Sequence, residues 1–381
     1  MSIIQLISFF GTAIICIAYA LLIGSFTIGW FRLPLVSSSL QPPSTIATII
    51  IAARNEEVNL GNCLRAIAAQ DYPKTLFEVI VVDDHSTDGT IELVRKIISE
   101  YPSLKIKLLE LGDGMEGKKN AISQAINSAI GEWIVTTDAD CRMYKQWISS
   151  LMQYAPDKSL QMLLAPVVFK REKSIFGQLQ ELEFLSLQAS TAGAAGMGLP
   201  IMCNGANLAY RKNTFLEING YLGNKHFASG DDMFLMMKIR KTYGSRSIRF
   251  VKSISAIVTT SAASNFSGFI NQRLRWVSKS SGYRDAWVIM TSVVVYAFSL
   301  GTIISVLAWA FGYAEPLVPV TFLSVKLLVD FPLMAACTRF VNRSHLMLWY
   351  IPLQFIYLVY VTIIGALGNL IKYSWKGREL H

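Results

Sequence analysis

Charged residues are absent from three long stretches of the sequence, at residues 2–31, 286–314 and 346–371. Each stretch is longer than the roughly 20 apolar residues that a helix needs to cross a bilayer. A fourth stretch at 317–337 is nearly as apolar, with Lys326 and Asp330 as its only charged residues. The chain is 52% hydrophobic, against about 45–50% in a typical soluble protein. The sequence therefore predicts four transmembrane helices, one N-terminal and three C-terminal, around a polar middle.

Cysteine is also scarce, and no two cysteines have the spacing of a metal-binding or redox motif. The five are Cys16, Cys63, Cys141, Cys203 and Cys337, which favours reduced thiols in a cytosolic domain. The net charge is +9, but no basic stripe is interleaved with aromatic residues, so we expect no nucleic-acid partner. The charge fits contact with anionic membrane lipids or with a phosphate-bearing ligand.

The positive residues also predict the topology. Most Lys and Arg fall between Arg32 and Asp285, and positive segments remain in the cytoplasm. We expect a multi-pass protein of the inner membrane with a cytoplasmic middle. The first stretch lacks the basic segment of a cleavable signal peptide and is expected to remain as an anchor. Four crossings would place the basic tail outside, so one re-entrant or interfacial stretch remains an alternative.

Short β-branched runs alternate with helical patterns in the first half of the polar middle, as is typical of a nucleotide-binding α/β fold. The predicted strands are residues 45–53, 77–84, 105–111 and 132–138. The first two read as strands buried on both faces of a parallel sheet. Helices are expected at 55–70, after a cap at Ser86, Thr87 or Asp88, and at 118–130. The first helix should begin near Glu56 and Glu57, with Val58 on its apolar face.

Four aspartates follow two of these strands: Asp83, Asp84, Asp138 and Asp140. Ligands bind beyond the carboxyl ends of the strands in such sheets. Clustered carboxylates repel one another unless a cation lies among them, and their oxygens suit Mg²⁺ or Mn²⁺ holding a diphosphate. The pattern predicts a metal-dependent diphosphate site. Carboxylates that only cap the following turns are the alternative.

Two further polar clusters allow both a functional and a structural interpretation. Asn204, Gly205 and Asn207 form a short polar turn that would let a ligand approach the backbone, or that only reverses the chain. Asp231 and Asp232 precede an apolar helical stretch, where an acidic pair is either functional or a helix cap.

The segments near the membrane contribute two more predictions. Residues 269–285 combine basic and aromatic residues before a spanning run, which predicts an interfacial amphipathic helix. Lys326 and Asp330 have the i, i+4 spacing of an ion pair on one helix face, and we favour this pairing. A polar path for a product is the alternative.

Taken together, the motifs resemble those of the family-2 glycosyltransferases, in particular the membrane-integrated branch with cellulose, hyaluronan and poly-N-acetylglucosamine synthases and ceramide glucosyltransferase. The resemblance covers about residues 45–276 and rests on AARNEE (52–57), VVDDHSTDGT (81–90), GKKNAI (117–122), DAD (138–140), GDD (230–232) and QRLRW (272–276). QRLRW matches the family's Gln-x-x-Arg-Trp at every fixed position. Three positions depart from the usual pattern: Ala52 stands for proline, His85 for glycine and Asp231 for glutamate.

The resemblance implies a role for each motif residue. Donor binding falls on Ala53, Arg54, Glu56, Asp84, Lys118 and Asp138. The cation, Mg²⁺ or Mn²⁺, would be held by Asp140, with Asp138 contacting the donor or the metal through water. The catalytic base would be Asp232, with Asp231 as the next candidate. The acceptor or diphosphate would contact Asn204, Gly205, Gln272, Arg275 and Trp276, although Trp276 packing on the interfacial helix is an alternative.

The implied fold is of the GT-A type, a Rossmann-like mixed α/β sheet with helices on both faces, joined to transmembrane helices. The expected domains are an anchor (1–31), a cytosolic catalytic domain (32–268), an interfacial segment (269–285), transmembrane helices (286–371) and a short basic tail (372–381).

The implied activity is inverting transfer from a UDP-sugar to a hydroxyl of a polysaccharide or glycoconjugate, forming a β-linkage. Transfer of a single sugar to a membrane lipid is the alternative. A membrane nucleotidyltransferase or sugar-phosphate enzyme and a non-catalytic transporter or scaffold are rivals from other classes. Self-association, which could complete a channel, stays open.

Overall fold

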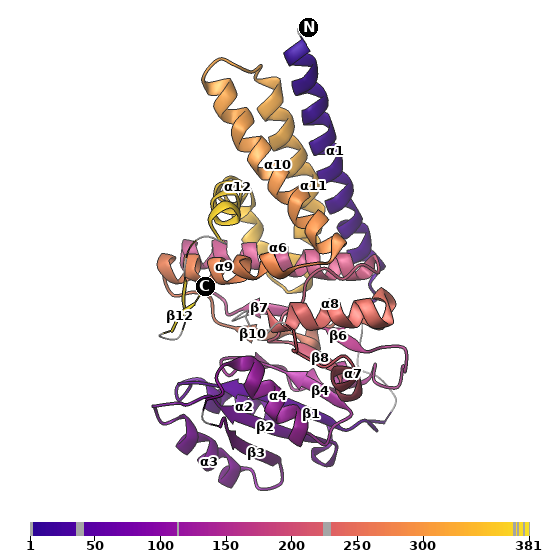
Figure 1. The fold of residues 1–381 in the computed structure, drawn as a ribbon, viewed down its shortest axis with the longest axis vertical. Helices are drawn as coiled ribbons and strands as arrows, with labels where there is room; N and C mark the ends of the chain where they lie inside the picture. Colours follow the sequence, from indigo (N-terminus) through magenta and orange to yellow (C-terminus); the bar gives the residue numbers. More distant parts are fainter. Residues whose placement is uncertain are drawn as a thin grey trace. The chain divides into compact units, whose positions relative to one another are not determined.

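The chain folds into two compact units in the computed structural model, which describes residues 3–35, 42–112, 114–223, 230–368, 371, 373–375 and 378–380 (Figure 1). The sheet unit contains Leu33–Lys170 and Met202–Ser261. The helical unit contains Met1–Arg32, Arg171–Ile201 and Ala262–His381. Each unit is therefore assembled from segments that are separated in the sequence.

The sheet unit is built on a seven-stranded mixed sheet with the order β3-β2-β1-β4-β8-β6-β9. Its strands are β1 (Ala47–Ala53), β2 (Phe77–Asp83), β3 (Lys105–Glu110), β4 (Trp133–Thr136), β6 (Met162–Leu164), β8 (Leu208–Arg211) and β9 (Ile248–Phe250). The first four coincide with the four predicted strands. They pair in parallel, whereas β8 runs antiparallel to β4 and to β6.

β1 and β2 are buried as their apolar runs predict, with every residue of β2 buried, whereas β3 is partly exposed. A small second sheet has the order β5-β10-β7, formed by Arg142–Met143, Val258–Thr260 and Val167–Phe169. The α-helices are α2 (Leu60–Ala68), α3 (Thr90–Glu100), α4 (Lys118–Ser128), α5 (Trp147–Met152), α7 (Lys212–Glu217) and α8 (Asp231–Tyr243). The 3-10 turns are η1 (Lys74–Leu76), η2 (Ser245–Ser247) and η3 (Ile254–Ala256).

The start of α2 differs from the prediction. The helix begins at Leu60, so Glu56 and Glu57 precede it and Val58 is 84% exposed. The reason lies in the loop before α3. Thr90 Oγ1 accepts the backbone N–H of Glu56 at 2.8 Å, and an Asp88 carboxylate oxygen accepts that of Glu57 at 3.1 Å. These bonds hold the segment against the neighbouring loop and keep it out of the helix.

The helical unit contains α1 (Ile3–Arg32), α6 (Ile175–Gly196), α9 (Phe266–Ser278), α10 (Ala286–Ala310), α11 (Leu317–Phe340) and α12 (Tyr350–Leu367). The 3-10 turns η4 (Lys279–Gly282) and η5 (Ser344–Trp349) precede α10 and α12. Among the described residues, four helical segments are long and apolar enough to span a membrane: Phe10–Arg32, Ala286–Ala310, Leu317–Phe340 and Ser344–Leu367. This confirms the predicted one plus three arrangement. Figure 1 shows α1, α10 and α11 lying side by side.

The end of the chain is described only in part. Two short antiparallel strands, β11 (Tyr373–Trp375) and β12 (Arg378–Leu380), lie in the predicted basic tail. Lys372 and Lys376 of that tail lie outside the described residues.

Glycines allow α1 and α6 to approach each other closely. A Cβ atom at Gly193 would overlap the carbonyl oxygen of Phe26, and one at Gly29 would overlap that of Gly193. Gly196 is similarly close to Gly29. Small residues at a helix crossing are typical of packing between membrane helices. α6 belongs to the helical unit although it lies inside the range 32–268.

Lys326 and Asp330 of α11 pair with each other, as predicted. Lys326 Nζ lies 2.8 Å from an Asp330 carboxylate oxygen, and both groups contact the Tyr19 hydroxyl of α1. The Lys326 ammonium also lies 4.6 Å from the centre of the Tyr357 ring on α12. The pair therefore ties three candidate spans together, as buried charges in membranes usually require a partner.

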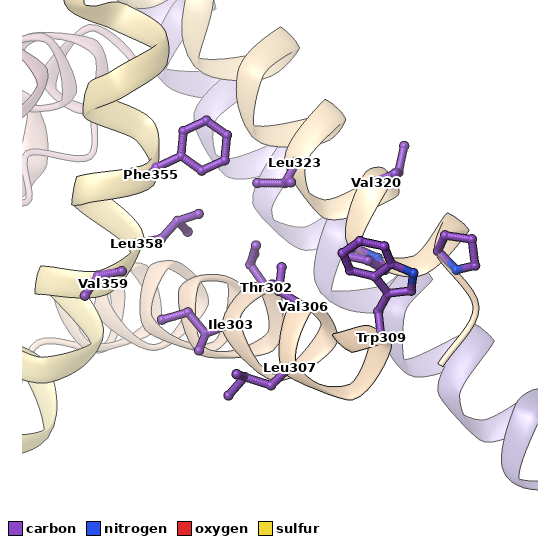
Figure 2. Close-up of a pocket in the computed structure, with 12 residues that line it drawn as sticks. Thr302, Ile303, Val306, Leu307, Trp309, Val320, Leu323, Phe355, Leu358 and Val359 are labelled. Atoms are coloured by element: carbon purple, nitrogen blue, oxygen red, sulfur yellow. The ribbon is translucent and has the colours of Figure 1, made fainter. Parts of the chain in front are cut away.

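A cavity of about 380 Å³ lies among α10, α11 and α12 (Figure 2). Its lining is almost entirely apolar, with Ile303, Val306 and Leu307 from α10, Leu323 from α11 and Phe355 and Leu358 from α12. Thr302, the main polar residue of the lining, donates its hydroxyl to the Phe298 carbonyl of its own helix. The cavity is therefore suited to an apolar ligand.

Candidate active site

The beginning of α4 contacts three acidic motifs through three consecutive residues. Gly117, with φ +87°, donates its backbone N–H to an Asp84 carboxylate oxygen at 3.1 Å. Lys118 forms an ion pair with Asp138. Lys119 Nζ lies 3.2 Å from an Asp231 carboxylate oxygen. Three aspartates that are far apart in the sequence therefore meet at one helix terminus.

Asp84 follows β2 and is only 4% exposed. Its backbone N–H bonds to the Ala53 carbonyl at 2.8 Å, which joins the ends of β1 and β2. Arg54 Nη1 donates to the Asp84 carbonyl at 2.9 Å and lies 3.7 Å from its carboxylate. The side chain of Glu56 accepts from Asn59 Nδ2 at 3.1 Å, so it stabilises the turn before α2. These contacts hold residues that the sequence predicts to bind the donor at one edge of the sheet, and the donor-binding role stays a prediction.

His85 occupies a left-handed conformation with φ +57°. Glycine adopts this region at little cost, which accounts for the glycine that is usual here in the resembling family. His85 Nδ1 lies 3.3 Å from an Asp84 carboxylate oxygen, so the imidazole has a partner that glycine would lack.

Asp138, Asp140 and Cys141 place one potential ligand atom each within 4.8 Å of one another. Asp140 also accepts a hydrogen bond from Thr260 Oγ1 at 2.7 Å. Burial, and then the charges of Asp138 and Asp140, raise the pKa of the Cys141 thiol well above its ordinary value. The thiol is therefore neutral, and the charged ligands are carboxylate oxygens. This donor set fits a hard cation such as Mg²⁺ or Mn²⁺.

Asp231 and Asp232 begin α8, directly after Gly230 with φ +87°. Asp232 accepts backbone N–H groups from Gly205 at 2.9 Å and from Met233 at 2.8 Å. Asp231 is buried, and burial raises its pKa to about 6; Lys119 opposes the shift and the Asp232 charge adds to it. The two neighbouring carboxyls therefore differ, because backbone donors bind Asp232 while Asp231 is desolvated.

Gly205 lies between Lys118 and Asp232. A Cβ atom at this glycine would be 3.5 Å from Lys118 Nζ and 3.7 Å from an Asp232 carboxylate oxygen. Burial lowers the pKa of Lys118, but the charges of Asp138, Asp232 and Asp231 raise it further, so the net direction is upward. The ammonium therefore stays charged between the two acidic groups.

The polar turn before β8 contains one buried residue, Asn207, and two partly exposed residues, Asn204 and Gly205. Asn207 is buried, accepts from Trp147 Nε1 at 2.9 Å and donates to the Pro166 and Ala256 carbonyls. Asn204 closes the turn by accepting the Ala206 N–H at 3.0 Å, and Gly205 faces Lys118. Asn207 is therefore structural, as the alternative interpretation predicted for this turn.

Sequence patterns did not single out Lys119 and Thr260. The doubled lysine of GKKNAI was a usable signal for Lys119, because adjacent residues at a helix start point in different directions. Thr260 lies on a short strand and has no sequence signal that marks it as a partner of Asp140.

The QRLRW motif lies on α9 of the helical unit, where the predicted interfacial segment begins. The Trp276 ring packs 6.0 Å from the Phe184 ring of α6 and 4.2 Å from the Arg273 guanidinium. Trp276 therefore has a packing role within the helical unit. The acceptor or diphosphate roles of Gln272, Arg275 and Trp276 stay predictions.

Comparison with known families identifies the chain. Residues 42–279 match the family described as "Glycosyltransferase like family 2". The chain belongs to this family. It is a family-2 glycosyltransferase with a GT-A-like mixed sheet and four candidate transmembrane helices.

Two curated relatives of this glycosyltransferase match it over about a quarter of the chain. Glycosyltransferase AglE of Haloferax volcanii is 38% identical over 101 residues, which cover 26% of this chain and 32% of AglE. The beta-monoglucosyldiacylglycerol synthase of Synechocystis sp. is 31% identical over 107 residues, covering 28% of this chain and 22% of the synthase. The matched segments thus span a third or less of each relative's length.

A solved structure extends the likeness to nearly the whole chain. The mannosyltransferase PcManGT of Pyrobaculum calidifontis, in complex with GDP-Man and Mn²⁺, superposes with a TM-score of 0.60. The superposition covers 94% of this glycosyltransferase and 99% of PcManGT, at 21% sequence identity. The two proteins therefore share a fold.

Proposed function

We propose that this glycosyltransferase transfers a sugar from a UDP-sugar to an acceptor hydroxyl with inversion, which forms a β-linkage. The observation that carries the proposal is the position of Lys118, paired with Asp138 and facing Asp232 across Gly205. The candidate metal ligands, a cation for the diphosphate and a candidate base thus lie around one point of the sheet unit.

Asp140 and Asp138 would hold Mg²⁺ or Mn²⁺, which when bound supplies positive charge to the departing diphosphate. Lys118 adds a second cation on the same side. Its contact with Asp138 keeps the ammonium in place before the donor arrives. Arg54 and Asp84 would bind the nucleoside, because they form the buried end of β1 and β2.

Asp232 would accept the proton of the attacking hydroxyl as general base. Its two backbone N–H donors fix the position of the carboxylate. Attack on the sugar from the face opposite the leaving diphosphate inverts the anomeric carbon. Asp231, whose pKa is about 6, is the second candidate for this role.

For the acceptor, we propose a polysaccharide or glycoconjugate, with Gln272, Arg275 and Trp276 contributing to its binding or to that of the diphosphate. QRLRW resembles the motif of a branch that contains both polymer synthases and a lipid glucosyltransferase, so the motif is compatible with either acceptor class. The sheet unit would lie in the cytoplasm of an inner-membrane protein, with the domain boundaries at residues 32, 269, 286 and 372.

A membrane lipid is the second candidate acceptor. The apolar cavity among α10, α11 and α12 favours it, because hydrocarbon would fill such a space inside a bilayer. The relative from Synechocystis is named for a product of this class, a glucosylated diacylglycerol.

Product analysis tests the proposal. The purified protein is incubated in lipid vesicles with radiolabelled UDP-sugars or GDP-sugars and Mn²⁺, and the products are separated by size and by solvent extraction. UDP release with a sized polymer or oligosaccharide supports the proposal, whereas a labelled lipid supports the second candidate. Release of pyrophosphate would identify a nucleotidyltransferase, and no turnover of any donor would refute both.

A further inference from the structure

Arg273, the second residue of QRLRW, is a variable position of the motif but is almost completely buried. Its side chain is 4% exposed. One guanidinium nitrogen donates to Gln272 Oε1 at 2.6 Å. The guanidinium carbon lies 4.2 Å from the centre of the Trp276 ring and 4.5 Å from that of Phe269. Arg273 therefore contacts two of the three fixed residues of the motif.

Glu183 of α6 is the ion-pair partner of the Arg273 guanidinium. The two side chains form an ion pair, and the Glu183 side chain is 2% exposed. The other carboxylate oxygen of Glu183 accepts the Tyr360 hydroxyl of α12. Leu274 of α9 packs against Ile364 of α12. α9 is thus fixed to two other helices, and the polar contacts pass through Glu183.

We propose that Arg273 and Glu183 are positioning residues that set the orientation of Gln272 and Trp276 for sugar transfer. This inference rests on the proposed function, because it assumes that the motif takes part in transfer.

The chemistry of the guanidinium explains why Arg273 suits this role. A buried charge requires a partner, and Glu183 supplies it. The planar guanidinium donates to Glu183 and Gln272 within its plane while its faces stack on aromatic rings. A lysine ammonium has no flat face, so it can replace the charge of Arg273 but not its stacking on Trp276. The pair therefore constrains the direction of the motif side chains.

A second buried pair on α6 offers a matched control. Arg343 forms an ion pair with Glu181, and their side chains are 10% and 1% exposed. Arg343 lies between α11 and η5 and pairs with Glu181 of α6, so neither member of this pair belongs to α9. Loss of either pair should affect folding in a similar way. Only loss of the Glu183 pair should affect the motif.

The experiment compares Arg273→Met, Arg273→Lys, Glu183→Gln and the double variant E183Q/R273M with Arg343→Met. The double variant keeps the experiment informative if a single variant does not fold, because it leaves no unpaired buried charge. Each protein is purified in detergent, and its folded fraction is measured. Sugar-transfer kinetics and hydrogen exchange of the α9 amides are then recorded.

For the folded fraction of the Arg273 and Glu183 variants, we expect kcat to fall about 10- to 100-fold with an unchanged KM for the donor. The double variant should lose no more than the worse single variant. Arg273→Lys should recover stability but not full turnover. Faster exchange of α9 is expected in these variants and not in Arg343→Met.

Equal effects of the two pairs on exchange and turnover would overturn the inference, as would normal turnover of the folded double variant. If the wild type transfers no sugar from any donor, the proposed function fails. The exchange comparison then decides alone whether Arg273 and Glu183 orient α9.

Discussion

Asp232 is the residue on which the proposed chemistry depends most directly. Asp232→Asn should lower kcat about 10²- to 10⁴-fold, the usual cost of losing a general base. UDP binding should stay unchanged, because the amide retains the shape of the side chain and the Lys118 contacts with Asp138 remain. Transfer assays and calorimetric titration with UDP measure the two effects. Full turnover in Asp232→Asn would move the base to Asp231.

The metal site gives a second prediction at the residue scale. Asp140→Ala should weaken Mn²⁺-dependent binding of the UDP-sugar and should remove the acceptor of the Thr260 hydroxyl bond. Titration of the donor with and without Mn²⁺ measures the change. Thr260→Val serves as the matched control, since it removes only the hydroxyl and should have a smaller effect. Wild-type binding and turnover by Asp140→Ala without metal would refute the assignment.

Asp231 makes the stability of the sheet unit dependent on pH. Its pKa rises on folding from the ordinary 3.8 to about 6, so the folded chain binds more protons than the unfolded chain in this range. Stability is therefore lost as the pH rises from about 4 to about 6. Asp231→Asn should flatten this part of the curve of Tm against pH. An unchanged curve would contradict the burial of the charge.

At the residue scale, the sequence was sufficient to predict that the acidic residues lie close together, but not which residues contact them. Asp84, Asp138 and Asp140 follow strands, and parallel strands bring their ends to one edge of a sheet. The contact of Lys119 with Asp231 depends instead on where α8 begins. The chain between these residues passes through the helical unit at Arg171–Ile201 before it returns to the sheet unit. No local pattern contains that information.

At the scale of elements, the crossing of α1 and α6 should tolerate no added side chain. Gly193→Ala forces a methyl group into the backbone of Phe26, and overpacking of this kind costs about 1–3 kcal/mol. Gly24→Ala on α1 is the control, because nothing lies within 4 Å of a Cβ atom there. Thermal unfolding in detergent should show a lower Tm only for Gly193→Ala. Equal Tm values would show that the helices can separate without cost.

The predicted boundaries of the elements agree with the structure where the apolar pattern is strong. They differ where a neighbouring loop binds backbone N–H groups at the predicted helix start. β1 and β2 match their predicted runs because unbroken β-branched segments fit a buried parallel sheet. The predicted start of α2 was wrong, because Thr90 and Asp88 accept the backbone N–H groups of Glu56 and Glu57. These two residues are therefore held in a loop before the helix. Such a contact between loops is not visible in either loop alone.

At the scale of the whole molecule, the sheet unit and the helical unit are interleaved along the chain. A fragment of residues 33–261 would contain α6 without α1 and α11, against which it packs in the helical unit. We expect this fragment to require detergent, because Leu182, Leu185 and Ala189 of α6 would lose their cover. Size-exclusion chromatography with and without detergent tests this. A soluble monomer would contradict the assignment of α6 to the helical unit.

The close crossing of α1 and α6 also bears on how the protein is made. Translation delivers α1 to the bilayer first, but Gly193 and Gly196 leave the ribosome only after β1 to β7 have been synthesised. During this interval, Gly29 of α1 lacks its partner helix α6 while the strands of the sheet are being synthesised. Insertion and assembly are separate events for this helix, and a cell that slows the ribosome after residue 32 would prolong the interval between them.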